Sequence, residues 1–169
     1  MADCGTPCGY KIPVIGLRTP IPRWPCFKAA VGTELGVSEW IDVTEERINL
    51  FAQATCDDQW IHVDQVPAKT GTRGGVTVAN GLLSLSLAPM FIRSVMGLKG
   101  LHNTLNYGAD RIRYHSPVPA GSRIRGRTSI AEAEDIPPNG LRVNYHVVVE
   151  IQGGQSPACV VDLIALHYH

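Results

Sequence analysis

The stretch VTVANGLLSLSLAPMFI, residues 76–92, decides the fold because it runs for 17 residues without a charged side chain. This length is at the short limit for crossing a bilayer, and Asn80 and Pro89 interrupt the run before Arg93 ends it. A buried helix therefore fits the run better than a membrane span. From residue 81 to about residue 96 the chain is apolar nearly all round, which predicts a helix enclosed on most sides, with Asn80 as its N-cap.

The chain after residue 100 changes to alternating apolar and polar residues, the pattern of half-buried strands. The turn sequences PVPAGS, DIPPNG and GGQSP separate the runs. A sheet needs its apolar face covered, and the chain offers one long apolar helix to cover it. The sequence thus predicts an α+β domain in which an antiparallel sheet wraps around a central helix. The expected strands are residues 104–107, 111–114, 122–133, 141–151 and 158–168.

Composition limits the class of protein. The chain has 169 residues, of which 44% are hydrophobic, enough for one domain with a real core. Lys and Arg together number 15, as do Asp and Glu, so nucleic acid and anionic membranes exert no general attraction. The five cysteines are odd in number and scattered, which argues against a disulfide framework and against a zinc site. The N-terminus has no secretion or organelle signal, so the cytoplasm is the expected location.

The amino-terminal segment is rich in proline, which lacks the hydrogen-bond donor that helix interiors and central strands need. We expect an extended arm over residues 1–26. Including the few residues that follow, the predicted division is a proline-rich arm over residues 1–30 and a single domain over residues 31–169.

A short strand and a helix are expected next. Residues 40–43 have the composition of a strand, and Thr44 is the expected N-cap of a helix over residues 45–55. Two glutamates lie in its first turn, where the helix dipole favours negative charge. The helix delivers Asp57 just beyond its carboxyl end, and a loop is expected over residues 67–75.

The segment TCDDQWIHVD, residues 55–64, contains a candidate acid/base pair. Asp57 and His62 are five residues apart across an expected non-helical turn, so both side chains could reach one water molecule. A carboxylate and an imidazole supply the acceptor, the donor and the near-neutral titration that acid/base catalysis uses. The alternative is that Asp57 caps a turn and His62 makes a buried hydrogen bond.

Gly81 is the second candidate. A backbone N–H in the first turn of a buried helix has no partner within the helix and attracts a developing oxyanion. The alternative is that this glycine only allows the helix to pack closely on the sheet.

These motifs resemble a known family over residues 31–168. TCDDQWIHVD, then GGVTVANGLLSLSL, NYGADRIRYHSPVPAGSRIRGR and the closing PACVVDLIALHY resemble the MaoC-like dehydratases. Within them the chain is similar to the nodulation protein N-like branch of (R)-specific enoyl-CoA hydratases. The resemblance implies a hot-dog fold, an antiparallel sheet around one long helix, and a homodimer.

The resemblance also implies the chemistry. Asp57, Gln59 and His62 fill the family's motif, and Gly81 matches the glycine whose amide binds the thioester carbonyl. The implied reaction adds water reversibly to a trans-2-enoyl thioester of CoA or a carrier protein, giving the (R)-3-hydroxyacyl product. Asp57 and His62 would hold the water, and no metal or redox cofactor is required.

Two positions depart from the family pattern, since Cys56 replaces a glycine and Asn80 replaces a histidine. Both are expected to line the substrate pocket. Arg111 and Arg113 are candidate contacts for the phosphates of the thioester carrier, although a solvated strand face is the alternative. The departures leave two other functions open: dehydration or cyclisation of a polyketide-like intermediate, and non-catalytic binding of acyl thioesters. Thioester hydrolysis is disfavoured by the match to the hydratase pattern.

Overall fold

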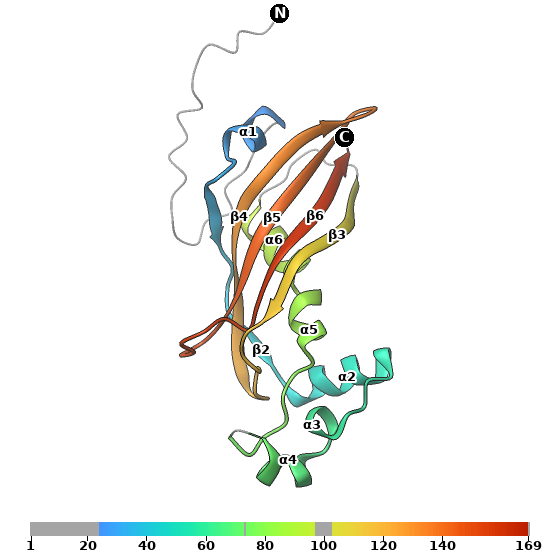
Figure 1. The fold of residues 1–169 in the computed structure, drawn as a ribbon, viewed down its shortest axis with the longest axis vertical. Helices are drawn as coiled ribbons and strands as arrows, with labels where there is room; N and C mark the ends of the chain where they lie inside the picture. Colours follow the sequence, from blue (N-terminus) through green and yellow to red (C-terminus); the bar gives the residue numbers. More distant parts are fainter. Residues whose placement is uncertain (1–23, 73, 97–102, 169) are drawn as a thin grey trace, which may run out of the picture.

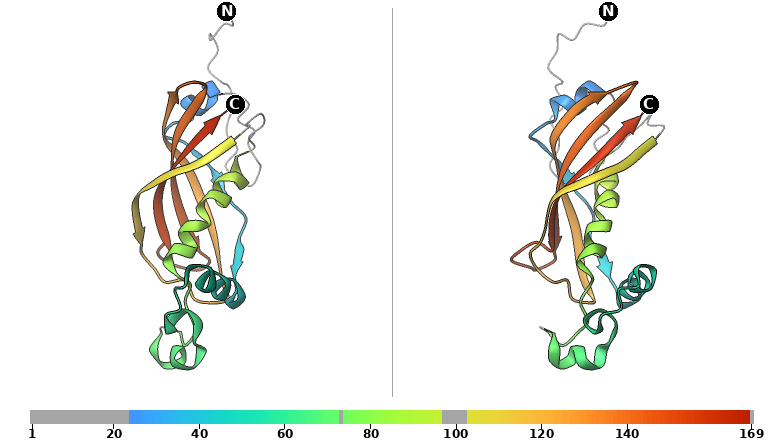
Figure 2. Two further views of the ribbon diagram at one scale, coloured as in Figure 1. Left: turned by 90° about the vertical axis from the view of Figure 1, so that its right-hand side faces the viewer. Right: turned by 45° about the vertical axis from the view of Figure 1, so that its right-hand side comes forward.

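A computed structural model describes residues 24–72, 74–96 and 103–168 (Figure 1). Six strands form one antiparallel sheet in the order β1-β4-β5-β6-β3. Strand β2 pairs with the first residues of β4, on the same side as β1. The sheet curves around helices α5 and α6, as the two turned views make clear (Figure 2). The elements in chain order are α1 Trp24–Ala29, β1 Glu34–Val37, β2 Ile41–Val43, α2 Glu45–Thr55, α3 Trp60–Val63, α4 Gln65–Gly71, α5 Gly81–Ser86, α6 Ala88–Val95, β3 Asn103–Tyr114, β4 Ser122–Ile136, β5 Gly140–Ile151 and β6 Cys159–Tyr168.

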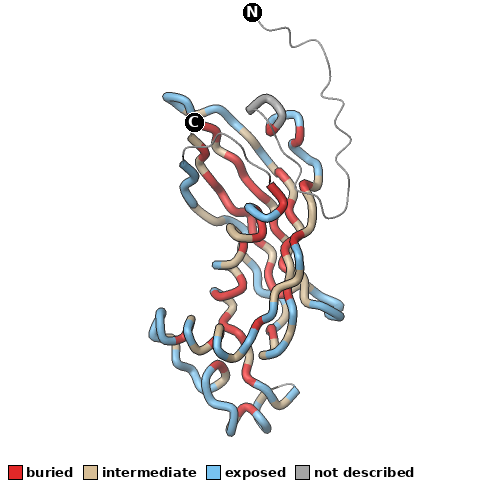
Figure 3. The backbone as a smooth tube through the Cα atoms, turned by 180° about the vertical axis from the view of Figure 1, so that it is seen from behind, coloured by how far each residue is buried: buried red, intermediate tan, exposed pale blue. Residues whose placement is uncertain are grey.

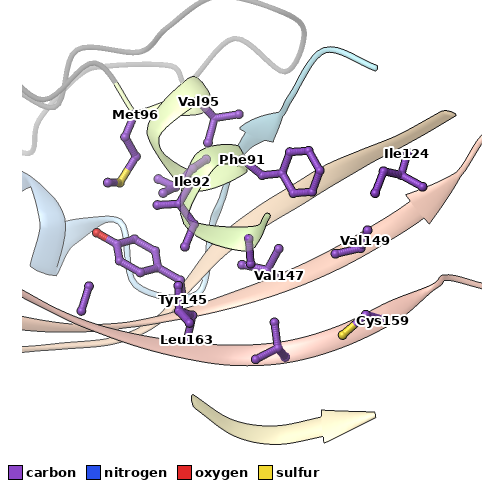
Figure 4. Close-up of a cluster of buried hydrophobic side chains, with 14 of the residues drawn as sticks. Phe91, Ile92, Val95, Met96, Ile124, Tyr145, Val147, Val149, Cys159 and Leu163 are labelled. Carbon is purple, nitrogen blue, oxygen red and sulfur yellow. The ribbon is translucent and has the colours of Figure 1, made fainter. Parts of the chain in front are cut away.

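The predicted central helix is present but divided at Leu87 into α5 and α6. The break has a local cause, because Pro89 lacks the N–H that would bond the Leu85 carbonyl, and the Leu87 N–H takes that oxygen instead. Phe91 of α6 packs directly against Gly126 of β4, where a side chain would collide with its ring. Figure 4 shows α6 side chains packed against the inner faces of β5 and β6. The core therefore lies between α6 and the sheet.

The strands after residue 100 confirm the predicted pattern, with differences at the ends. The two short strands expected before residue 115 are one strand, β3, whose register shifts between Asn106 and Gly108 and again between Asp110 and Arg113. Strand β1 was not predicted, and it pairs with β4 through an irregular register. Burial is concentrated on the sheet and the central helix, and the lower helices are largely exposed (Figure 3).

Helices α2, α3 and α4 form a lobe beyond the end of the sheet (Figure 1). Helix α2 has the predicted bounds, and the Thr44 hydroxyl caps it by accepting from the Arg47 N–H. Two predictions here are wrong, since the non-helical turn before His62 becomes helix α3, and the predicted loop from residue 67 is helical as far as residue 71. Asp64 explains the second error because its carboxylate accepts from the Val66 N–H and starts α4.

The predicted amino-terminal arm lies mostly outside the described residues, which begin at residue 24. Its extended conformation is wrong from that point, because Trp24–Ala29 is helix α1. Phe27 is buried in the core, so the last part of the arm packs on the domain. The boundary at residue 30 stays a prediction. In the part of the chain that the structure describes, no helix is long and apolar enough to cross a membrane.

Candidate active site

His62 lies in helix α3 and is only 8% exposed. Its Nδ1 atom lies 2.7 Å from the carbonyl oxygen of Val78. A carbonyl can only accept, so Nδ1 carries the proton, and a neutral ring then has its lone pair at Nε2. No described residue hydrogen-bonds to Nε2. The fold therefore fixes the ring and leaves one nitrogen available to act as a base.

Asp57 follows the carboxyl end of helix α2 and is held by two side-chain amides. Asn80 Nδ2 donates to Asp57 Oδ2 at 2.6 Å, and Gln59 Nε2 donates to Oδ1 at 3.3 Å. Each carboxylate oxygen thus has one amide donor and keeps lone pairs for a further partner. This arrangement suits an ionised carboxylate that accepts hydrogen bonds.

Residues 78–81 connect the predicted catalytic groups. His62 binds the backbone of Val78, Asp57 binds the side chain of Asn80, and Gly81 begins helix α5. The acid/base pair and the proposed oxyanion donor are therefore attached to four consecutive residues. The structure thus gathers Asp57, Gln59, His62, Asn80 and Gly81 around one segment, and their roles stay predictions. The capping role expected for the Asn80 side chain is wrong.

A hollow of about 330 Å³ lies beside this segment, and both His62 and Gly81 line it. Asp57 and Asn80 are not among the lining residues, so the pocket contact predicted for Asn80 is not seen, although its neighbours Ala79 and Gly81 line the hollow. Strand β3 and the loop after it supply the opposite wall. The lining residues are Ile61, His62, Val78, Ala79, Gly81, Ser84, Tyr114, His115, Ser116, Pro117, Val118 and Ala158.

Tyr114 packs on the start of helix α5. A Cβ atom at Gly81 would lie 3.0 Å from the Tyr114 ring, so the close-packing role considered for this glycine is real. No described residue accepts a hydrogen bond from the Gly81 N–H, and the oxyanion role stays a prediction. Burial raises the pKa of the Tyr114 phenol and Cys159 raises it further, so the ring beside the hollow is neutral at physiological pH.

Cys56 occupies the C-cap of helix α2 in a left-handed conformation, with φ 56° and ψ 28°. That region favours glycine because a Cβ atom is crowded there, which explains why a glycine fits this position. The Cys56 side chain is exposed and does not line the hollow. Its predicted contact with substrate has no support in this geometry.

Arg111 and Arg113 lie outside the hollow. Arg111 sits in the β3 bulge at φ 51°, and its guanidinium pairs with the buried carboxylate of Asp162, which also bonds to His146 Nδ1 at 2.7 Å. Arg113 bonds to the carbonyl of Ile112 and is exposed. Arg111 is therefore engaged by the sheet, and a phosphate contact at Arg113 stays a prediction.

The wall formed by Tyr114, His115 and Ser116 was not predicted from the sequence. These residues end strand β3 and begin the loop after it, a place where binding residues gather, but no spacing rule links them to the distant Asp57 and His62 motif. Ser84, one turn into helix α5, was also missed. Within the described ranges, no three His, Cys, Asp or Glu side chains cluster as metal ligands would.

Comparisons with known proteins agree with this architecture. The family model described as "MaoC like domain" matches residues 26–150. 3-Hydroxyacyl-thioester dehydratase Z of Mycobacterium tuberculosis (strain ATCC 25618 / H37Rv) is 40% identical over 136 residues, covering 80% of this chain and 89% of that protein. Nodulation protein N of Rhizobium leguminosarum bv. viciae is 41% identical over 142 residues, covering 80% of this chain and 85% of its own.

A solved structure supports the fold. The R-hydratase PhaJ1 from Pseudomonas aeruginosa, in its unliganded form, superposes with a TM-score of 0.62 and 24% identity, covering 82% of each chain. The antiparallel sheet around a helix is thus the predicted hot-dog fold. The chain belongs to the MaoC-like family, and that prediction is confirmed.

Proposed function

We propose that the protein is an (R)-specific hydratase/dehydratase that interconverts trans-2-enoyl and (R)-3-hydroxyacyl thioesters. The single observation that carries this proposal is the attachment of Asp57, His62 and Gly81 to residues 78–81, next to a hollow large enough for a small acyl group. Two relatives that match most of the chain support it, and one of them is named a 3-hydroxyacyl-thioester dehydratase.

The hydration step follows from the two acceptors. Water donates one hydrogen to the Asp57 carboxylate and the other to His62 Nε2, and His62 removes its proton as the water oxygen bonds to C3. The electrons of the C2–C3 double bond move toward the thioester oxygen, where the Gly81 N–H stabilises the negative charge. The proton then passes from His62 to C2 on the same face. Dehydration follows the same steps in reverse.

Hydration of crotonyl-CoA tests the proposal through the loss of absorbance of its conjugated enoyl thioester. We expect turnover by the wild-type protein and an (R)-3-hydroxybutyryl product on a chiral column. Asp57→Asn and Asp58→Asn form a matched pair of neighbouring carboxylates, and only the first should abolish turnover. An active D57N protein, or release of free thiol without hydration, would contradict the proposed reaction.

We further propose that two copies associate through strand β3. This strand is at the edge of the sheet, and its Leu105 and Tyr107 side chains are 47% and 67% exposed. The outer edge of such a strand presents backbone N–H and C=O groups that can pair with another chain. Light scattering should give the mass of a dimer, and Tyr107→Lys should give a monomer. Leu50→Lys, at an exposed leucine of helix α2, is the control that should remain dimeric.

The proposed reaction requires only water and the thioester, so activity should persist after dialysis against EDTA. A cytoplasmic location is a further proposal, which cell fractionation tests. Retention of a tagged protein in the membrane fraction would contradict it.

A further inference from the structure

Asn80 is placed to cap helix α5 but does not do so. An asparagine at the N-cap usually accepts from a backbone N–H of the first turn. Here the side chain makes no cap hydrogen bond, and its amide nitrogen instead donates to Asp57 Oδ2 at 2.6 Å. The residue is 2% exposed. Its side chain therefore serves the carboxylate rather than the helix.

The orientation of this amide follows from its partner. A carboxylate oxygen only accepts, so the NH₂ group of Asn80 must face Asp57 and the amide oxygen must point away from it. That oxygen, Oδ1, is buried and has no hydrogen-bond partner among the described residues. A buried acceptor without a donor lowers stability. The fold thus keeps an unfavourable group whose one good contact is with a predicted catalytic carboxylate.

Gln59 is the weaker of the two amides that hold Asp57. Its donor lies 3.3 Å from Oδ1 and the contact is exposed, whereas the Asn80 contact is shorter and partly buried. Asn80 is also two residues from Val78, the anchor of His62. It can therefore set the position of the carboxylate relative to the imidazole.

We propose that Asn80 is a positioning residue for the acid/base step, an inference that rests on the proposed function. Its amide fixes the Asp57 carboxylate beside residues 78–81 without adding a titratable group. This positioning role requires a hydrogen-bond donor that stays neutral at every pH, as an amide does.

Asn80→Ala and Asn80→Asp test this role, with Asn144→Ala and Asn144→Asp as matched controls. Asn144 on strand β5 is also a buried asparagine whose Oδ1 has no partner among the described residues, and it does not line the hollow. We expect N80A to lower kcat about 100-fold, as a misplaced catalytic group does, with little change in KM. Both N144 variants should keep kcat close to that of the wild type.

Asn80→Asp gives a readout that a merely structural role would not produce. Two adjacent carboxyl groups share one proton, and while they share it the new group can still donate to Asp57. We expect N80D to lose activity as rising pH removes that proton, a limb that the wild-type profile lacks. An N80D profile with the wild-type shape would overturn the proposal.

Crystal structures of the wild type and N80A supply a test that needs no turnover. Displacement of the Asp57 carboxylate in N80A supports the proposal, and an unmoved carboxylate overturns it. If the wild type fails to hydrate crotonyl-CoA, the proposed function fails, and this structural comparison still decides whether Asn80 positions Asp57.

Discussion

His62 and His167 are both buried, but the two regions hold their rings differently. His62 binds Val78 through Nδ1 and has no described partner at Nε2. His167, on the inner face of the sheet, bonds to Tyr145 Oη at Nε2 and to Thr104 Oγ1 at Nδ1, at 2.7 and 3.0 Å. Each ring lines a hollow, that of His167 about 220 Å³. What separates the proposed base from a structural histidine here is a ring nitrogen without a described partner, not burial.

Replacing His62 should have the largest effect. His62→Gln removes the proposed base, and general acid/base catalysis contributes about 100- to 10,000-fold. We expect turnover of crotonyl-CoA to fall by this factor while the circular dichroism spectrum keeps its native shape. His146→Gln, at a partly exposed histidine on the sheet, is the control. Equal rates for H62Q and wild type would contradict the assignment of His62 as the base.

Replacing His167 should affect stability and its pH dependence. Burial lowers the pKa of His167 from 6.5 to about 4. The unfolded chain then binds more protons than the folded one between these values, so the histidine destabilises the fold as pH falls from 6.5 toward 4. Each unit of difference between the two pKa values corresponds to about 1.4 kcal/mol, so the free energy of unfolding falls by about 3 kcal/mol across this range. Well above pH 6.5 the His167 ring is neutral in both the folded and the unfolded chain, so its titration no longer reduces the free energy of unfolding.

Urea unfolding at several pH values measures this difference. The glutamine of His167→Gln cannot titrate. The difference in free energy of unfolding between wild type and variant should therefore narrow as pH falls below 6.5. The carboxylates titrate in both proteins, so their effect on the free energy of unfolding cancels when the two are compared. A gap that stays constant from pH 7.5 to 4 would contradict the assignment.

Two glycines test the same contrast through packing. Gly126 faces the ring of Phe91, which is fully buried, and Gly81 faces Tyr114, which is 47% exposed and can move. We expect G126A to lower the free energy of unfolding by about 3 kcal/mol and G81A by about 1 kcal/mol. The double variant G81A/Y114A should relieve the strain of the single one. Similar losses for G126A and G81A would show that both regions are equally rigid.

Cys56 should give the smallest effect, in the opposite direction. Its left-handed conformation is unfavourable for a residue with a Cβ atom by about 1 kcal/mol. Cys56→Gly should therefore raise the free energy of unfolding by about that amount, less the added flexibility of glycine in the unfolded chain. The exposed Thr55→Gly, inside helix α2, should lower it instead. Loss of stability in C56G would contradict the strain argument.

The sequence predicted what periodicity encodes. The strands over residues 122–168 and helix α2 follow from alternation and from the Thr44 cap, and their bounds differ from the structure by only a few residues. The break at Leu87 was not predicted because a proline in an apolar run can kink a helix as well as break it, and the sequence does not distinguish the two. Strand β1 escaped because ELGV is short and contains a glycine.

The candidate site also has a part that local sequence patterns predict and a part that they do not. The Asp57 and His62 pair is local in sequence, so its spacing could be recognised. The wall of Tyr114 and His115 depends on how strand β3 approaches helix α5, which no local pattern contains. The partner of Asn80 could not be predicted either, because its usual capping role was the better expectation from sequence.

Strand β3 has one more consequence, which is a matter of mass action. The strand ends in Tyr114, on the wall of the hollow, and its unpaired edge is where we propose that a second copy binds. If pairing steadies that wall, specific activity will fall on dilution below the dissociation constant of the dimer and recover on concentration. The concentration of the protein would then itself set the rate per active site.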